Sequence, residues 1–213
     1  MKIPIANQLK KKQQIEIAGL QDEVIDMVYS VADDLILHGG TSIWRCYSGK
    51  RFSEDLDLYS PTFPEKSTRF EKTVKSHGLA LTKIKDTGNV TFTDISNGNV
   101  SVRIEVNHIN KIHRINTFYE LVDGTLIDIL SLSINQLILE KISAYNDRRF
   151  IRDLYDIFHL ITLNQDVSAV KKDLQEFVLH INKPVDEGVL KSIVYSGLPP
   201  SYDRMVEQIW RVV

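Results

Sequence analysis

The segment from residue 37 to residue 59 limits the possible folds of this chain more than any other, and its sequence is LHGGTSIWRCYSGKRFSEDLDLY. An apolar run leads into two glycines, then two hydroxyl residues, and the segment closes on two acids set among leucines. This order predicts a short buried strand at 35–37, a tight turn, a helix at 41–47 and a second strand at 55–59. The front of the chain is therefore expected to be a mixed α/β structure.

The glycine turn is a candidate phosphate site. It consists of Gly39 and Gly40, followed by Thr41 and Ser42. Glycines adopt positive φ and let the backbone approach a polyphosphate closely, and the N–H groups that open the next helix face an anion. The two hydroxyls would cap that helix equally well, and both roles are compatible. Arg45, one turn further, either reaches the phosphate or is simply exposed.

Two aspartates in the second predicted strand form a candidate metal site. Asp55 and Asp57 are two residues apart, so their side chains share one face of the strand, while Leu56 and Leu58 point into the core. Mg²⁺ binds hard oxygen ligands and usually takes one or two carboxylates together with waters and substrate phosphates. The spacing therefore predicts a site for Mg²⁺, or for Mn²⁺, which accepts the same ligands.

A later stretch alternates between apolar and polar residues. Glu105 lies on the polar face of its last strand, where it can form an ion pair with its neighbour Arg103. The dipeptide Asn97-Gly98 predicts a hairpin. The expected strands are 79–85, 90–95 and 100–108.

These motifs resemble the DNA polymerase β-like nucleotidyltransferases, whose signature is GG[ST] followed by D-x-D. The fuller form, HGGTSIWR…RFSEDLDLY, is similar to the AbiEii-type nucleotidyltransferase toxins of bacterial and archaeal toxin–antitoxin systems. A second block, LSLSINQLILEKISAYNDRRFIRDLYDIFHL, is similar to that family's later motifs, a lysine on one helix followed by R-x-x-x-R-D-x-x-D. The two blocks cover about a quarter of the chain in the expected order.

The resemblance implies roles for several residues. Enzymes of this superfamily usually supply a third metal carboxylate from a later strand, and Glu105 is the candidate for it if it does not pair with Arg103 instead. Thr41 matches the hydroxyl position of the signature, and Lys141 matches a phosphate-binding lysine, although a lysine beside an apolar helix stripe is usually a surface residue. Asp153 is expected to orient Lys141 or the nucleotide. For Asp156 we expect a salt bridge along a helix, because Arg148, Arg152 and Asp156 are spaced four residues apart.

The resemblance also implies an activity. An acceptor hydroxyl would attack the α-phosphate of an NTP and release pyrophosphate, with RNA, notably the 3′ end of tRNA, as the acceptor and a winged-helix antitoxin as a partner. Two alternatives stay open: transfer to a small-molecule or protein hydroxyl, and a nucleotide-binding regulatory module without turnover.

The expected fold class is α+β, with a polymerase-β-like nucleotidyltransferase core, a small mixed sheet flanked by helices, followed by a C-terminal helical bundle. The domains are predicted at 1–130 and 131–213. In the second domain Ser133 is expected to cap one helix and Asp147 the next.

Charge and composition narrow the possible partners. The formal net charge is −2, from 26 basic and 28 acidic residues, so any RNA contact must come from a local patch. We expect that patch to include Lys50-Arg51 and Arg148-Arg149. The single cysteine, Cys46, is expected to fill core space, and His38 and His159 to be structural. No stretch approaches the length of a membrane span and no signal peptide is recognisable, so the expected location is the cytoplasm.

Overall fold

The computed structural model describes residues 3–82, 84–164 and 166–213, which form two compact units. The first unit contains the described residues up to Cys46 together with Phe52–Leu132. The second contains Ser133–Val213 and the short segment Tyr47–Arg51. The chain therefore enters the second unit briefly, between the glycine-turn helix and the strand that carries the candidate metal ligands.

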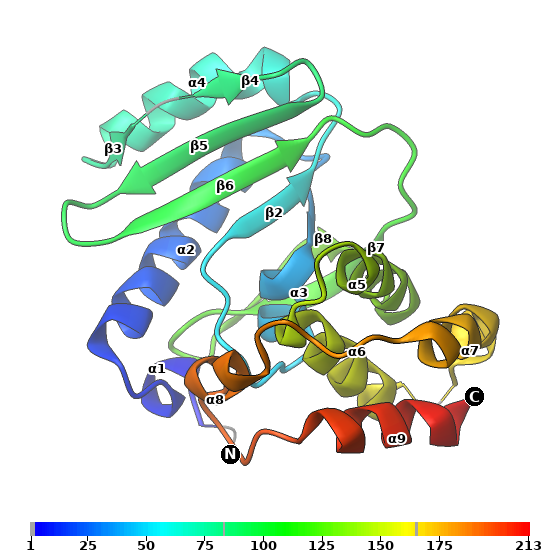
Figure 1. Ribbon diagram of the computed structural model, residues 1–213. Helices are drawn as coiled ribbons and strands as arrows, with labels where there is room; N and C mark the ends of the chain where they lie inside the picture. Colours follow the sequence, from blue (N-terminus) through cyan, green and yellow to red (C-terminus); the bar gives the residue numbers. More distant parts are fainter. Residues whose placement is uncertain (1–2, 83, 165) are drawn as a thin grey trace. The chain divides into compact units, whose positions relative to one another are not determined.

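The first unit is built on a mixed sheet (Figure 1). Within the described residues the sheet has eight strands in the order β3-β5-β6-β2-β1-β8-β7, with β4 paired to β5. β2 pairs antiparallel with β1 and parallel with β6, and β1 pairs parallel with β8. The strands are β1 Ile36–His38, β2 Leu56–Tyr59, β3 Ala80–Leu81, β4 Lys85–Asp86, β5 Val90–Ser96, β6 Ser101–Asn107, β7 Ile115–Glu120 and β8 Leu126–Ser131.

Helices cover one face of this sheet. The long helix α2 (Lys12–Val31) packs on β6, and α4 (Phe63–Ser76) packs on α2 and β3, so both lie behind the sheet in Figure 1. The alternate residues of β2 and β6, which include Leu58 and Val106, are completely buried. Because neighbouring residues of a strand point to opposite faces, Asp57 and Glu105 lie on the other face. Two further helices belong to this unit, α1 Ile5–Gln8 and α3 Gly39–Cys46.

The second unit is helical. Its α-helices are α5 Ile134–Arg148, α6 Ile151–Leu163, α7 Lys171–His180, α8 Leu190–Ile193 and α9 Tyr202–Val212, with short 3₁₀ helices at Ser168–Val170 and Glu187–Val189. Ser133 begins α5 with a reciprocal cap, because its side chain accepts from the Gln136 N–H while the Gln136 side chain accepts from the Ser133 N–H. Arg149 ends α5 in the left-handed conformation, with φ 53°. α5 and α6 pack extensively against each other.

The predicted fold class is confirmed, and several local predictions were wrong. Asp147 does not cap α6; Asp186 does, accepting a hydrogen bond from the Ile151 N–H at 2.6 Å. Arg148 and Asp156 do not share a helix, because α5 ends at Arg148 and α6 begins at Ile151. The strand β7 had not been expected. The strand predicted at 79–85 is described as β3 and β4, and its residue 83 lies outside the described residues.

None of the helices in the described part of the chain combines the length and apolar character needed to cross a bilayer.

Candidate functional site

The first unit brings the predicted acids Asp57 and Glu105 next to each other. They are direct partners in the parallel pairing of β2 with β6, and His38 of β1 is the partner of Asp57 on its other side. Side chains of directly paired residues lie on one face, with strands about 4.8 Å apart. All three residues are half-buried. Glu105 accepts a hydrogen bond from Asn107 Nδ2 at 3.2 Å, which orients its carboxylate on this face.

The glycine turn contacts the Asp57 carboxylate. Gly39 has φ +68°, a conformation that side chains rarely adopt. A Cβ built at this position collides with Asp57 Oδ2 and lies 3.0 Å from Asp57 Cγ. The space that any other residue would fill is therefore occupied by the acid, and the predicted phosphate turn and metal ligand form one site.

Asp55 precedes β2, and its side chain is exposed. The Thr41 hydroxyl donates to the Asp55 backbone carbonyl at 2.5 Å, and Thr41 is completely buried. This bond fastens the start of α3 to the loop that carries Asp55. The hydroxyl of Thr41 thus positions the acid loop relative to the glycine turn.

Ser42 is also buried, with its hydroxyl 2.7 Å from the Ser131 hydroxyl. Ser131 gives its own proton to the Leu37 carbonyl at 2.7 Å, so Ser42 is the donor in the first bond. Its hydroxyl holds α3 against β8 and β1. The contact with phosphate expected of this turn therefore has to come from its backbone N–H groups.

Arg45 is neither exposed nor available to a phosphate, so both roles predicted for it are wrong. It is 1% exposed, and its guanidinium pairs with Asp22 and donates to the Tyr119 hydroxyl and the Ala18 carbonyl, each at 3.0 Å. Burial raises the pKa of Asp22, while Arg45 opposes that rise. Arg45 is a buried structural cation that joins α3 to α2 and β7.

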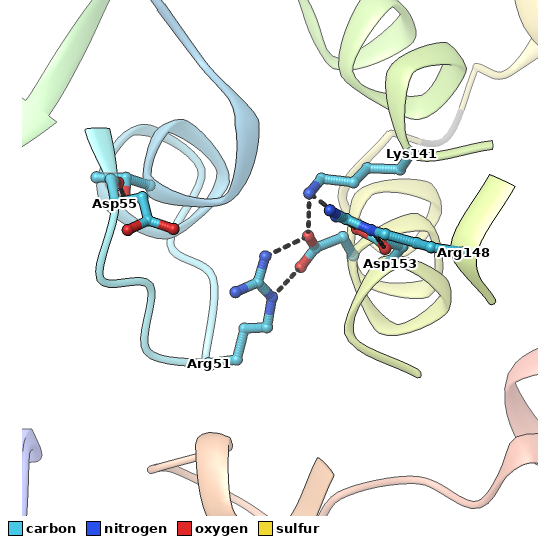
Figure 2. A network of polar contacts seen from close by, with 7 residues as sticks. Arg51, Asp55, Lys141, Arg148 and Asp153 are labelled. Carbon is cyan, nitrogen blue, oxygen red and sulfur yellow. Dashed lines mark hydrogen bonds and ion pairs between the residues drawn. The ribbon is translucent and has the colours of Figure 1, made fainter. Parts of the chain in front are cut away.

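The second unit contains a buried ion network around Lys141 (Figure 2). The Lys141 ammonium lies 3.2 Å from Asp153 Oδ1 and 3.0 Å from Asp156 Oδ2. These three residues are at most 6% exposed. Lys141 is therefore not a surface lysine, and its charge is fixed between two carboxylates of α6.

Two arginines complete this network. Arg51 makes two bonds of 2.6 Å to Asp156, one from Nε and one from Nη2. Arg148 bonds to Asp153 through Nε at 2.8 Å and Nη2 at 2.9 Å. Burial alone raises the pKa of Asp156, but Arg51 and Lys141 outweigh it and hold that pKa below its usual range. Each of the two carboxylates of α6 thus contacts both Lys141 and an arginine.

Asp156 thus pairs across the fold rather than along a helix, which corrects the prediction for this residue. Its partner Arg51 was expected to contact RNA, but it is 5% exposed and committed to Asp156. Arg148 is likewise engaged with Asp153. Because its side chain is 37% exposed, Arg148 stays in the expected RNA patch with Lys50 and Arg149, and Arg51 is the residue removed from it.

The segment 47–51 is held to the second unit along its length. The Tyr47 carbonyl lies 2.8 Å from His159 Nε2, the Tyr195 hydroxyl donates to the Gly49 carbonyl at 2.8 Å, and the Tyr195 N–H donates to Lys50 at 3.1 Å. His159 is structural, as predicted, and burial lowers its pKa. Asp55 follows this fastened segment by only a few residues.

Cys46, at the end of α3, has no feature of a nucleophile. Burial raises the pKa of its thiol to about 12, so the thiol is protonated at neutral pH.

Among the described residues, no group of three or more His, Cys, Asp or Glu side chains is arranged so that it could bind a metal ion. A magnesium ion bound to a nucleotide does not require one, because substrate phosphates and waters supply most of its ligands. The carboxylates of Asp57 and Glu105, with Asp55 nearby in sequence, are the donor set that the first unit offers.

Comparison with known proteins gives consistent results. The sequence model of a family described as "Nucleotidyl transferase AbiEii toxin, Type IV TA system" matches residues 28–209. The crystal structure of JHP933 from Helicobacter pylori is similar with a TM-score of 0.61 and 18% identity, over 95% of this chain and 90% of that one. A candidate nucleotidyltransferase from H. pylori is similar with a TM-score of 0.60 and 19% identity, over 95% and 94% of the two chains. No curated protein sequence matches this chain.

Proposed function

Because the chain belongs to the AbiEii nucleotidyl transferase toxin family, we propose that it transfers a nucleoside monophosphate from an NTP to the 3′ end of an RNA, with tRNA as the acceptor. The acceptor hydroxyl forms a bond to the α-phosphorus, the bond from that phosphorus to the β-phosphate oxygen breaks, and pyrophosphate leaves with the electron pair. The observation that supports this site most directly is the contact between the Gly39 turn and Asp57, opposite Glu105.

The carboxylates fit a divalent metal. Asp57 and Glu105 are neighbours on one sheet face, and their oxygens are the hard ligands that Mg²⁺ or Mn²⁺ prefers. Asp55 would join them from the loop that Thr41 fastens. When bound, the metal would neutralise phosphate charge and stabilise the charge that develops on the attacking and leaving oxygens. We propose that Glu105, which lies on the side of Asp57 away from the glycine turn, accepts the proton of the acceptor hydroxyl.

The glycine turn is the proposed holder of the β- and γ-phosphates. The backbone N–H groups in the first turn of a helix lack partners within that helix, so they can donate to phosphate oxygens. Gly39 and Gly40 add no side chain that would keep the phosphates away. Thr41 and Ser42 contribute by holding the turn rigid through their buried hydroxyl bonds.

Lys141 and Asp153, which lie in the second unit, are proposed to act on the triphosphate, as their match to the family's later motif implies. Lys141 balances phosphate charge as pyrophosphate forms, and Asp153 positions its ammonium at 3.2 Å. An ammonium held between two carboxylates is restricted in orientation.

We further propose that the protein acts in the cytoplasm and that a winged-helix antitoxin is its partner, since the family is one of toxin–antitoxin systems. Co-expression offers the test. The protein alone should arrest growth of a host cell, the Asp57→Asn variant should not, and the product of a neighbouring winged-helix gene should relieve the arrest. If Asp57→Asn arrests growth as strongly as the parent, the toxicity does not depend on nucleotidyl transfer.

The activity is tested by incubating the protein with each α-labelled NTP, Mg²⁺ or Mn²⁺, and total tRNA. We expect label on RNA with one or more NTPs, with pyrophosphate released in equal amount, and no label in the presence of a metal chelator. Label on a small hydroxyl compound or on protein instead of RNA would move the conclusion to the alternative acceptors. NTP binding without any turnover would identify a regulatory module.

A further inference from the structure

A depression on the sheet of the first unit has no part in the transfer as described above. It lies over β4, β5 and β6, has a volume of about 430 Å³, and is lined by Lys85, Phe92, Thr93, Asp94 and Arg103. This volume lies within the range of small-molecule sites. The depression combines an aromatic ring with charged groups.

The depression opens on the same sheet face as the candidate metal site. Phe92 is the direct partner of Glu105 across β5 and β6, and Glu105 is the direct partner of Asp57 across β6 and β2. Directly paired residues share a face. Two strand spacings of about 4.8 Å separate β5 from β2, so Phe92 lies about 10 Å from Asp57. That separation is suited to one nucleotide between the aromatic ring and the acids.

The depression and the glycine turn lie on opposite sides of Asp57. The strand order is β5-β6-β2-β1, and the glycine turn follows β1. In an in-line displacement the attacking and leaving oxygens lie on opposite sides of the phosphorus. With pyrophosphate leaving at the glycine turn, the acceptor hydroxyl approaches from the side of β6 and β5. The depression is on that side.

The chemistry of its lining matches a nucleic acid strand. Arg103 lies over the Phe92 ring, with Cζ 5.4 Å from the ring centroid. Lys85 and Arg103 are exposed cations, and Asp94 is the single carboxylate, so these residues carry a formal charge of +1 in a chain of net charge −2. Aromatic rings flanked by cations are how proteins hold unpaired nucleotides without reading their sequence.

We propose that this depression binds an unpaired nucleotide at the 3′ end of the acceptor RNA, an inference that rests on the RNA transfer proposed above. The Phe92 ring stacks on the base. Lys85 and Arg103 contact the adjoining phosphates, and the terminal ribose hydroxyl extends over Glu105 toward Asp57.

The test measures binding of a short fluorescent single-stranded RNA and, separately, the KM values for total tRNA and NTP. Phe92→Ala should weaken RNA binding about 5- to 150-fold, the range for losing one base–aromatic stack. Phe92→Trp should restore binding, because it keeps the stacking surface. Lys85→Ala should lower the slope of log affinity against log salt by about 0.7. In Phe92→Ala and Lys85→Ala the KM for tRNA should rise while the KM for NTP stays unchanged; Phe92→Trp should leave both near the parental values.

Two matched controls lie in the same unit. Phe118→Ala removes an aromatic side chain that is 56% exposed on β7, and Lys72→Ala removes an exposed cation of α4. Both should bind RNA like the parent. Phe92→Leu keeps an apolar side chain but lacks the ring. If it unfolds in urea like the parent by circular dichroism and yet binds RNA weakly, the loss of binding comes from the lost stacking and not from a loss of structure.

The outcomes distinguish this subsite from the transfer itself. If the parent labels tRNA and Phe92→Ala has an unchanged KM for tRNA, the subsite is refuted and the transfer stands. If the parent binds RNA through Phe92 but labels none, the transfer is refuted and the subsite stands. If Phe92→Ala weakens NTP binding as much as RNA binding, the depression holds the NTP base and the acceptor assignment is overturned.

Discussion

Replacing Arg51 with methionine should destabilise the second unit more than any surface charge change. Arg51 is 5% exposed and makes two bonds of 2.6 Å to Asp156, which is 1% exposed. Removing one member of a buried ion pair typically costs 3–5 kcal/mol, because the other charge stays buried. Lys141 remains 3.0 Å from Asp156 and compensates in part, so we expect a loss of about 3 kcal/mol, the lower end of that range.

The assay is urea unfolding followed by circular dichroism, with a double-mutant cycle. Arg51→Lys keeps the charge but not the two-bond geometry, so it should fall between the parent and Arg51→Met. Adding Asp156→Leu to Arg51→Met should recover part of the loss, since no uncompensated carboxylate remains. The coupling energy of the cycle reports the pair itself.

A matched control is available on the surface. Lys75 and Glu71 are also 2.6 Å apart, but the Lys75 side chain is 64% exposed. Lys75→Met should therefore change the free energy of unfolding by at most about 0.5 kcal/mol. An effect of Arg51→Met no larger than that of Lys75→Met would refute the conclusion that the network stabilises the second unit.

Three further predictions concern the site and its pH dependence. Asp57→Asn should lower Mg²⁺-dependent transfer by orders of magnitude with little change in the urea midpoint; near-parental activity would exclude Asp57 as a metal ligand. Gly39→Ala should lose activity and at least about 1 kcal/mol of stability, because Gly39 has φ +68° and a Cβ there collides with Asp57. Gly19→Ala is the control: a Cβ there meets nothing within 4 Å, so this change should be neutral or slightly stabilising. Because the folded pKa of Asp156 is lowered while Arg51 and Lys141 are present, its stabilisation is complete above the unfolded value of about 3.9 and is lost as pH falls through the folded pKa. The Arg51→Met, Asp156→Leu double variant, which lacks this carboxylate, should therefore show a flatter acid limb in a stability–pH curve than the parent.

The central elements of the first unit could be predicted from the sequence, because the residue types and their spacing indicate the same local structures there. The two glycines, the alternating acids and leucines of β2, and the Asn97-Gly98 hairpin each specify one local structure. The hairpin is formed as expected, with Asn97 Oδ1 accepting from the N–H groups of Asn99 and Val100. Position in the sheet could also be inferred for Glu105, since its strand alternates cleanly.

The errors came from contacts between residues distant in sequence. Nothing local shows that Arg45 pairs with Asp22 inside the first unit, or that Arg51 crosses to Asp156, because both look like ordinary surface arginines in a charged context. The cap of α6 was misassigned for the same reason, as its acceptor Asp186 lies 35 residues beyond Ile151. The predicted roles of Lys141 and Asp153 came from the family motif, and their burial became visible only in the fold.

The placement of residues 47–51 has a consequence for how this protein can be divided or recombined. A fragment that starts at Ser133 contains every helix of the second unit, yet it omits the arginine that neutralises Asp156 and the backbone groups that bond His159 and Tyr195. We therefore expect that such a fragment does not fold on its own. A chimera in which the part from Ser133 onward is replaced by that of a relative would combine residues 47–51 of one protein with the helices of another. The two units are thus linked in sequence, because residues 47–51, which precede most of the first unit's strands in the chain, complete the interior of the second unit.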